Sequence, residues 1–198
     1  MKEKLFENPV FKLSLEVVGI FFAVVVALAA DQWVEDRERI ERKELILESI
    51  HSEISTNSAE LAEALEQLSV QLEKLEALNS RYSVDTTVSI NDEVREVWRV
   101  SFTGLRSTSW QSLILQSDIL ILIDIGRVEH LSAIYSLQSD IKDYLTKMIS
   151  EFGDKTTDLV QPKKGSGVLR SHYHDLSTLN QLAINLQSLL QEYLEAND

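Results

Sequence analysis

Few residue groups in this sequence have the types and spacing that chemistry requires. His172-x-His174-Asp175 offers two imidazoles and a carboxylate, but this pattern is weak outside a strand and no third ligand set accompanies it. We therefore expect a surface turn there, with Asp175 as a helix cap. The segment 163–167, KKGSG, has the composition of a phosphate-binding loop but lacks the G-x-x-x-x-G-K order and a preceding strand. We interpret it as a loop.

The remaining polar residues give no catalytic arrangement. Asp118 and Asp124 flank an apolar run, and caps or turn residues explain them better than a catalytic pair does. The sequence has no cysteine, which excludes disulfides, thiolate catalysis and Cys-based metal sites. No Ser-His-Asp arrangement can be argued from the four scattered histidines. We therefore expect no catalytic residue, no metal and no cofactor, and a protein that is not an enzyme.

Glu16 is the one acidic residue inside a long apolar stretch. On a helix it shares a face with three small residues, which follow at three- and four-residue steps: Gly19, Ala23 and Ala27. Small residues at this spacing let membrane helices approach closely. Three interpretations stay open. Glu16 pairs with Lys12 near the headgroups, or the face is a helix–helix contact, or it lines a path for ions in an oligomeric pore.

The stretch that contains Glu16 is predicted to be an uncleaved anchor. Residues 11–30 would form about 30 Å of helix, enough for one membrane crossing, with Trp33 at the far interface. Residues 27–29, ALA, resemble a signal-peptidase site, but Glu16 would interrupt the apolar core of a signal peptide. Basic residues are nearly equal in number on the two sides. We favour the N-terminus inside and the large domain outside the cytoplasm.

After Trp33 the helical pattern continues without a breaker. Opposite charges recur four residues apart, as in Glu35–Arg39 and Glu38–Arg42. An apolar seam with alternating three- and four-residue spacing follows, at Leu47, Ile50, Ile54, Leu61, Leu65, Leu68, Leu72 and Leu75. Asn57 or Ser58 falls where the seam expects an apolar residue, and the weak helix formers of 55–58 allow a bend. The seam packs either in the chain's own bundle or against a second copy.

The sequence pattern predicts that the rest of the chain is also mostly helical. The expected elements are a linker at 81–89, a short helix at 91–102, a buried core segment at 113–125, an amphipathic helix at 126–152, a loop at 161–169 and a last helix at 176–194. In the helix at 126–152 we expect Leu131, Ile134, Tyr135, Leu137, Ile141, Leu145, Met148 and Ile149 to face inward. In the last helix we expect Leu179, Leu182, Ala183, Leu186, Leu189, Leu190 and Tyr193 to be buried.

The predicted fold is all-α. A single N-terminal transmembrane helix continues into a long amphipathic helix, which packs with a C-terminal antiparallel helical bundle. The predicted divisions are an N-terminal tail at 1–8, a transmembrane anchor at 9–33, the long helix at 34–80 and the bundle at 81–198. The formal net charge of −13 disfavours a nucleic-acid partner, because phosphate contacts need basic residues.

Two segments resemble a family of uncharacterised bacterial single-pass membrane proteins. EVVGIFFAVVVALAADQWVEDRERIERKELILESIHSEISTN, residues 16–57, is similar to that family's Gly-containing anchor, terminal Trp and charged helix with a Glu…Asn pattern. TSWQSLILQSDILILID, residues 108–124, is similar to its second motif. Gly19, Trp33, Trp110 and Ile123 match, whereas the usual small residue near Ser117 is matched only in part. The resemblance implies an anchored helical domain and supplies no activity.

These observations lead to three expectations of function. The first is a non-enzymatic protein anchored in the bacterial inner membrane. It would contact lipid and act by association, as a homo-oligomer or as an accessory subunit of a membrane complex. The second is an extracytoplasmic helical-bundle sensor that binds a small ligand and signals through a partner. The third is an oligomeric pore lined by the Glu16 face.

Overall fold

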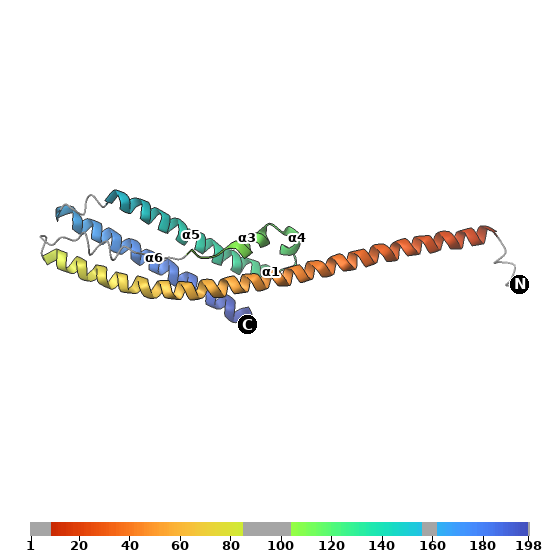
Figure 1. The fold of residues 1–198 in the computed structure, drawn as a ribbon, viewed down its shortest axis with the longest axis horizontal. Helices are drawn as coiled ribbons and strands as arrows, with labels where there is room; N and C mark the ends of the chain where they lie inside the picture. The colour runs from red at the N-terminus through yellow and green to blue at the C-terminus, as the bar shows by residue number, and fades with distance from the viewer. Residues whose placement is uncertain (1–8, 85–103, 156–161, 198) are drawn as a thin grey trace. The chain divides into compact units, whose positions relative to one another are not determined.

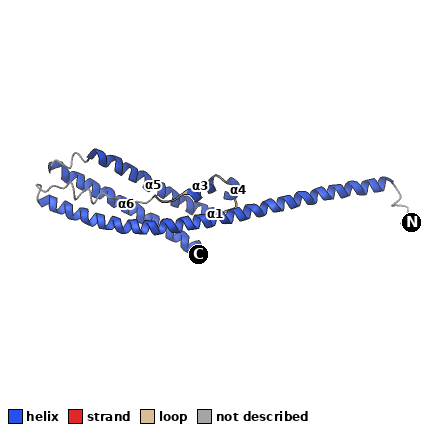
Figure 2. Cartoon of the chain, viewed as in Figure 1, coloured by secondary structure: helices blue, strands red, loops and turns tan. Residues whose placement is uncertain are grey.

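The computed structural model describes residues 9–84, 104–155 and 162–197, and the side chains of 13–81, 104–151 and 167–197. The described residues form five α-helices and their connections (Figures 1 and 2). These are α1 (Pro9–Val84), α3 (Thr108–Ile114), α4 (Ser117–Leu120), α5 (Ile125–Lys155) and α6 (Pro162–Asn197). The predicted all-α class is confirmed. The predicted tail at 1–8 and short helix at 91–102 lie outside the described residues.

The chain divides into two compact units, Met1–Leu45 and Ile46–Asp198. The first unit contains the beginning of α1, whose apolar side chains are exposed from Leu13 to Leu28. Among the described residues one helix, near the N-terminus, is long and apolar enough to cross a membrane. By length and composition this helix suits a membrane anchor or a signal sequence.

Polar contacts begin directly after the apolar stretch. The guanidinium of Arg37 lies 4.9 Å from the centre of the Trp33 ring. Arg39 Nη2 lies 2.7 Å from Glu35 Oε1, which confirms that predicted pair. Arg42 instead donates from Nε to the backbone oxygen of Glu38 at 3.3 Å, so this predicted side-chain pair is replaced by a main-chain contact.

The second unit is a bundle built from the later part of α1 together with α5 and α6. Tyr144 contacts Asp175, and His130 contacts Leu189, so early residues of α5 meet late residues of α6. The two helices are therefore antiparallel, as Figure 1 also shows. The fully buried core takes residues from all three helices, including Ile50, Ile54, Leu61, Leu68, Leu75, Leu131, Ile134, Leu176, Leu179, Leu186 and Leu190.

Helix α1 has no break at residues 55–58. Thr56 donates its hydroxyl hydrogen to the backbone oxygen of Ser52 at 2.9 Å, one turn earlier, which satisfies the hydroxyl without interrupting the helix. The helix ends at Val84, so the linker predicted from residue 81 begins too early. Burial of Leu75 and Leu78 stabilises this last part of α1 against the bundle.

The loop predicted at 161–169 and the late start of the last helix are wrong. Helix α6 begins at Pro162, a residue that suits a first helical position because it has no backbone N–H to lose. Two glycines within the segment weaken a helix by about 1 kcal/mol each. Leu169 is fully buried and Val168 packs against the core, and this burial offsets their cost. All the residues predicted to be buried farther along α6 do contribute to the core or pack against it.

The apolar run 113–125 is only partly a core segment. Its chain folds as α3, a turn and α4, so it cannot bury every apolar side chain on one face. The structure buries Leu113, Ile119 and Ile123. It leaves Leu115, Ile121 and Ile125 strongly exposed, contrary to the prediction. In α5 the predicted inward residues are buried or half-buried except Ile149, which is 68% exposed.

Candidate functional site

The residues of the predicted association face lie in the exposed first part of α1. Glu16, Gly19, Ala23 and Ala27 are all exposed, as are the bulky residues around them. A Cβ added at Gly19 would meet nothing within 4 Å. The proposed partner of Glu16, the side chain of Lys12, lies outside the described residues. Among the described residues, no side chain covers this face.

The predicted seam lies inside the bundle of the second unit. Ile50, Ile54, Leu61, Leu68 and Leu75 are buried in the core. Leu47, Leu65 and Leu72 pack against it from the side. A second copy would have to displace α5 or α6 to reach these side chains. The structure thus places the seam in an intramolecular interface.

The His-x-His motif lies in a regular helix and not in a turn. His172 is buried, whereas His174 is exposed, because residues two apart on a helix point to different sides. Asp175 does not cap a helix end but lies on the side of α6 that faces α5, where its Oδ1 accepts a hydrogen bond from the Tyr144 hydroxyl at 3.3 Å. Burial raises the pKa of Tyr144. A side-chain hydrogen bond with Thr178 partly counters this shift, and the charge of the nearby Asp175 adds to it. Within the described ranges no three acidic or histidine side chains are grouped to hold a metal.

Asp124 is the helix cap that the sequence suggested. Its Oδ1 accepts hydrogen bonds from the backbone N–H groups of Gly126 at 2.9 Å and Arg127 at 3.2 Å. These are the otherwise unpaired donors of the first turn of α5. Asp118 lies in the first turn of α4. Local helix ends thus account for the positions of both carboxylates.

A buried polar cluster joins α1, α3 and α5, and the sequence analysis did not predict it. The Tyr135 hydroxyl donates to Glu53 Oε1 at 2.6 Å, and the Ser109 backbone N–H donates to Glu53 Oε2 at 3.0 Å. Both carboxyl oxygens of Glu53 are therefore used. Burial first, and the Glu53 hydrogen bond and charge second, raise the pKa of Tyr135 strongly, so this phenol stays neutral.

One turn farther along α1, Asn57 holds the chain that leads into α3. Its Nδ2 donates to the backbone oxygen of Arg106 at 2.8 Å, and its Oδ1 accepts from the Arg106 N–H at 2.9 Å. Asn57 is fully buried, and the paired bonds explain an amide at an apolar seam position. Arg106 Nη2 also lies 3.4 Å from Glu60 Oε1. Together Glu53 and Asn57 fix the segment 104–110 across the bundle.

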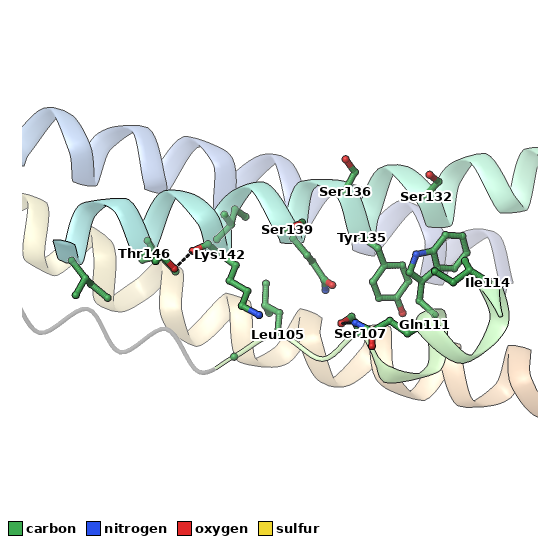
Figure 3. Close-up of a pocket in the computed structure, with 16 residues that line it drawn as sticks. Leu105, Ser107, Gln111, Ile114, Ser132, Tyr135, Ser136, Ser139, Lys142 and Thr146 are labelled. Atoms are coloured by element: carbon green, nitrogen blue, oxygen red, sulfur yellow. Dashed lines mark hydrogen bonds between the residues drawn. The ribbon is translucent and has the colours of Figure 1, made fainter. Parts of the chain in front are cut away.

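This fixed segment and α5 line a half-open cavity of about 670 Å³ (Figure 3). At one end the rings of Trp110 and Tyr135 are stacked, with centroids 5.3 Å apart and planes 3° from parallel. Figure 3 shows Tyr135 and Lys142 extending from α5 toward the segment that carries Leu105 and Ser107. Gln138 also lines the cavity. The lining thus combines an aromatic wall with an amide and an ammonium group.

Gln138 is the unusual member of this lining. The residue is 6% exposed, and its Oε1 and Nε2 are both buried without a hydrogen-bond partner in the part of the chain that the structure describes. Lys142, one turn later, is exposed and has no ion-pair partner among those same residues. Contacts within the described part of the chain therefore use neither the Gln138 amide nor the Lys142 charge.

Comparison with protein-family models, with curated proteins and with solved structures finds no match for this chain. The only sequence signal for the buried cluster was the polar Asn57 at an apolar seam position. Glu53 and Gln138 gave none, because isolated polar residues on long helices are usually exposed.

Proposed function

We propose that the protein is a non-enzymatic, membrane-anchored helical protein that acts by association, as a homo-oligomer or as an accessory subunit of a membrane complex. The observation that carries this proposal is the apolar first part of α1, where the described side chains from Leu13 to Leu28 are all exposed. Such a continuous apolar surface is unfavourable in water and marks contact with lipid or another protein. Its length suits one crossing of a bilayer.

The residues at the end of the apolar stretch support a membrane boundary there. Trp33 is exposed and interacts with Arg37, an arrangement in which the indole can lie among the headgroups while the guanidinium remains hydrated. The charged residues that follow, such as Glu35 and Arg39, pair with each other on the helix surface. This order of apolar, aromatic and charged residues agrees with an anchor that leaves the membrane after Trp33.

In this proposal the anchor is retained and the protein resides in the bacterial inner membrane. The resemblance of residues 16–57 to bacterial single-pass proteins agrees with this location. The intact mass of protein extracted from membranes should match the full chain, apart from changes at Met1. A mature N-terminus at Ala30 would contradict the anchor and would favour a cleaved signal peptide.

The bundle is proposed to lie outside the cytoplasm. A reporter that is active only outside the cytoplasm, fused after Asp198, should then be active. The same fusion with a reporter active only inside the cytoplasm should be silent. The opposite pair of results would reverse the topology, because basic residues are nearly balanced across the anchor.

Association is proposed to use the face of Gly19, Ala23 and Ala27. The Gly19→Ile substitution adds a branched side chain at the point where two helices would cross, while the segment stays apolar and should still insert. Val25→Ile, on another face, is the matched control. Individual contacts between membrane helices contribute on the order of 1–2 kcal/mol. A clash repeated in every copy of an oligomer should have a larger effect.

We expect Gly19→Ile to lower the native mass of the detergent-extracted protein or to release a partner subunit, and Val25→Ile to do neither. Glu16→Gln tests the neighbouring carboxyl group. The native mass should change little if Glu16 lies among the headgroups, and it should fall if Glu16 is paired in the interface. An unchanged native mass for Gly19→Ile would show that this face does not hold the assembly together.

A second candidate function is an extracytoplasmic sensor that binds a small ligand and signals through a partner. The cavity beside Trp110, Gln138 and Lys142 favours it, because the cavity's volume of about 670 Å³ falls within the range usual for small-molecule sites. The two functions are compatible, since the anchor face and the cavity belong to different parts of the chain. No described contact favours the pore.

A further inference from the structure

The cavity between α5 and the segment 104–111 has one lining residue whose polar atoms the described chain leaves unused. Gln138 is the key observation. A glutamine amide has a donor and an acceptor, and leaving both buried without partners disfavours folding. Within the described ranges neither atom has a partner, and the residue lines the cavity. A bound molecule that offers one donor and one acceptor would satisfy both atoms.

A secondary amide is the group that best matches Gln138. Its carbonyl oxygen can accept from Nε2 while its N–H donates to Oε1, as two amides pair in a sheet. The terminal torsion of a glutamine side chain is soft, so a small rotation can turn the amide of Gln138 into the cavity. A lone carboxylate would satisfy Gln138 less completely, because an ionised carboxylate only accepts.

Lys142 adds a charge requirement. It follows Gln138 by one helical turn on α5, so their side chains lie on the same face. Figure 3 shows Lys142 extending toward the segment that carries Leu105. An ammonium group with no ion-pair partner among the described residues attracts an anion, and an amino acid or peptide with an acylated amine carries a carboxylate beside its amide.

The remaining lining mixes serines, Gln111 and Thr146 with apolar and aromatic side chains. The stacked rings of Trp110 and Tyr135 close one end, and Leu105, Leu145 and Ile149 line other parts of the wall. This surface gains free energy by covering an aliphatic or aromatic group. The Tyr135 hydroxyl is held by Glu53, so its ring is a fixed wall and does not offer its proton to a ligand.

We propose that the cavity binds an N-acylated apolar amino acid or a short N-acylated apolar peptide with a free carboxylate. Gln138 pairs with the amide, Lys142 binds the carboxylate, and Trp110 packs against the apolar side chains. The inference deepens the sensor candidate by naming the class of its ligand. It does not depend on association, because binding at the cavity and the native mass are measured separately.

The test uses the full-length protein in detergent with Trp33→Phe and Trp98→Phe, so that Trp110 is the sole tryptophan. N-acetyl-leucyl-leucine is titrated while Trp110 emission is followed. The matched probes are N-acetyl-leucyl-leucinamide, which lacks the carboxylate, and hexanoate, which lacks the amide. We expect a saturable change with N-acetyl-leucyl-leucine and roughly tenfold or greater weakening with either matched probe, the loss expected when a charged or paired hydrogen bond is removed.

Two variants assign the roles, and a third controls for charge. Gln138→Leu should weaken binding of N-acetyl-leucyl-leucine about tenfold or more. Its melting temperature should be equal or higher, since the change removes an unpaired buried amide. Lys142→Met should abolish the preference for the free carboxylate over the carboxamide. Lys147→Met, whose lysine pairs with Glu151 and does not line the cavity, should change neither affinity nor preference.

Two outcomes would overturn the proposal. One is the absence of any saturable change in Trp110 emission with N-acetyl-leucyl-leucine while the protein remains folded. The other is unchanged binding by Gln138→Leu. The native mass, recorded on the same samples, reports on association. A negative titration with an intact oligomer would reject the ligand and leave the association proposal standing.

Discussion

The Tyr135 hydroxyl and the Glu53 carboxyl group form a 2.6 Å hydrogen bond that joins α5 to α1 inside the bundle. The second carboxyl oxygen of Glu53 accepts the backbone N–H of Ser109, so one acidic side chain holds two other segments of the chain. Trp110, the residue next to Ser109, stacks on the ring of Tyr135. The arrangement links three helices around a single buried carboxyl group.

Removing this hydrogen bond should destabilise the bundle. We expect Tyr135→Phe to lower the free energy of unfolding by about 1.5–3 kcal/mol, as for other bonds to ionisable groups. Glu53→Ala should lower the free energy of unfolding further, because it leaves the Tyr135 hydroxyl and the Ser109 N–H without their acceptor. Chemical denaturation of both variants and of the double variant measures the coupling between the two side chains.

Tyr173→Phe is the control for the loss of a phenol, since Tyr173 lies on the exposed side of α6. It should leave the free energy of unfolding within about 0.5 kcal/mol of the original. A Tyr135→Phe variant as stable as this control would show that the Glu53 contact contributes no net stability.

The same site predicts a loss of stability at alkaline pH. Burial and the Glu53 hydrogen bond raise the pKa of Tyr135 in the folded protein, whereas an unfolded chain releases this proton near pH 10. The contribution of neutral Tyr135 to the free energy of unfolding is therefore fully present below about pH 10. It declines as the pH rises from there toward the folded-state pKa. Denaturation at a series of alkaline pH values should show a steeper decline for the original protein than for Tyr135→Phe. Equal declines would contradict the raised pKa.

Asn57 should be essential to the position of the segment 104–110. Asn57→Leu continues the apolar seam but leaves the Arg106 N–H and carbonyl groups without partners. We expect the free energy of unfolding to fall by about 2–4 kcal/mol, since each buried polar group left without a hydrogen-bond partner costs about 1–3 kcal/mol. Hydrogen exchange should also become faster in residues 104–110. Gln67→Leu, on the exposed side of α1, should cause neither change.

The α3–α4 region predicts a sharp contrast between two neighbouring isoleucines. Ile119 is fully buried, whereas Ile121 is 80% exposed. We expect Ile119→Ala to lower the free energy of unfolding by about 2–5 kcal/mol, through lost burial and the cavity that is left. Ile121→Ala should change it by less than about 0.5 kcal/mol. Thermal or chemical unfolding distinguishes them, and similar losses for both would show that Ile121 is buried in the protein in solution.

The helical class and the apolar anchor follow from local features that the sequence displays. The anchor is visible as a continuous apolar stretch of 20 residues, and seam residues such as Leu61 and Leu68 recur at helical spacing. Each pattern can be recognised from positions close together in the sequence. Burial of the predicted inward residues of α6 follows from the same periodicity. Where periodicity was interrupted, the prediction failed, as at Pro162–Leu169, because the burial of Leu169 outweighs the weak helix propensity of two glycines.

Tertiary structure alone decided which polar residues are buried together. Glu53 and Tyr135 are 82 positions apart, and no local pattern relates a glutamate on one helix to a tyrosine on another. The same holds for Gln138, whose position at a cavity depends on how Glu53 and Asn57 hold the segment 104–110 across the bundle. Periodicity assigns a residue to a face of its own helix. Only the packing of the helices determines what that face meets, because side-chain contacts between distant segments depend on the position of both backbones.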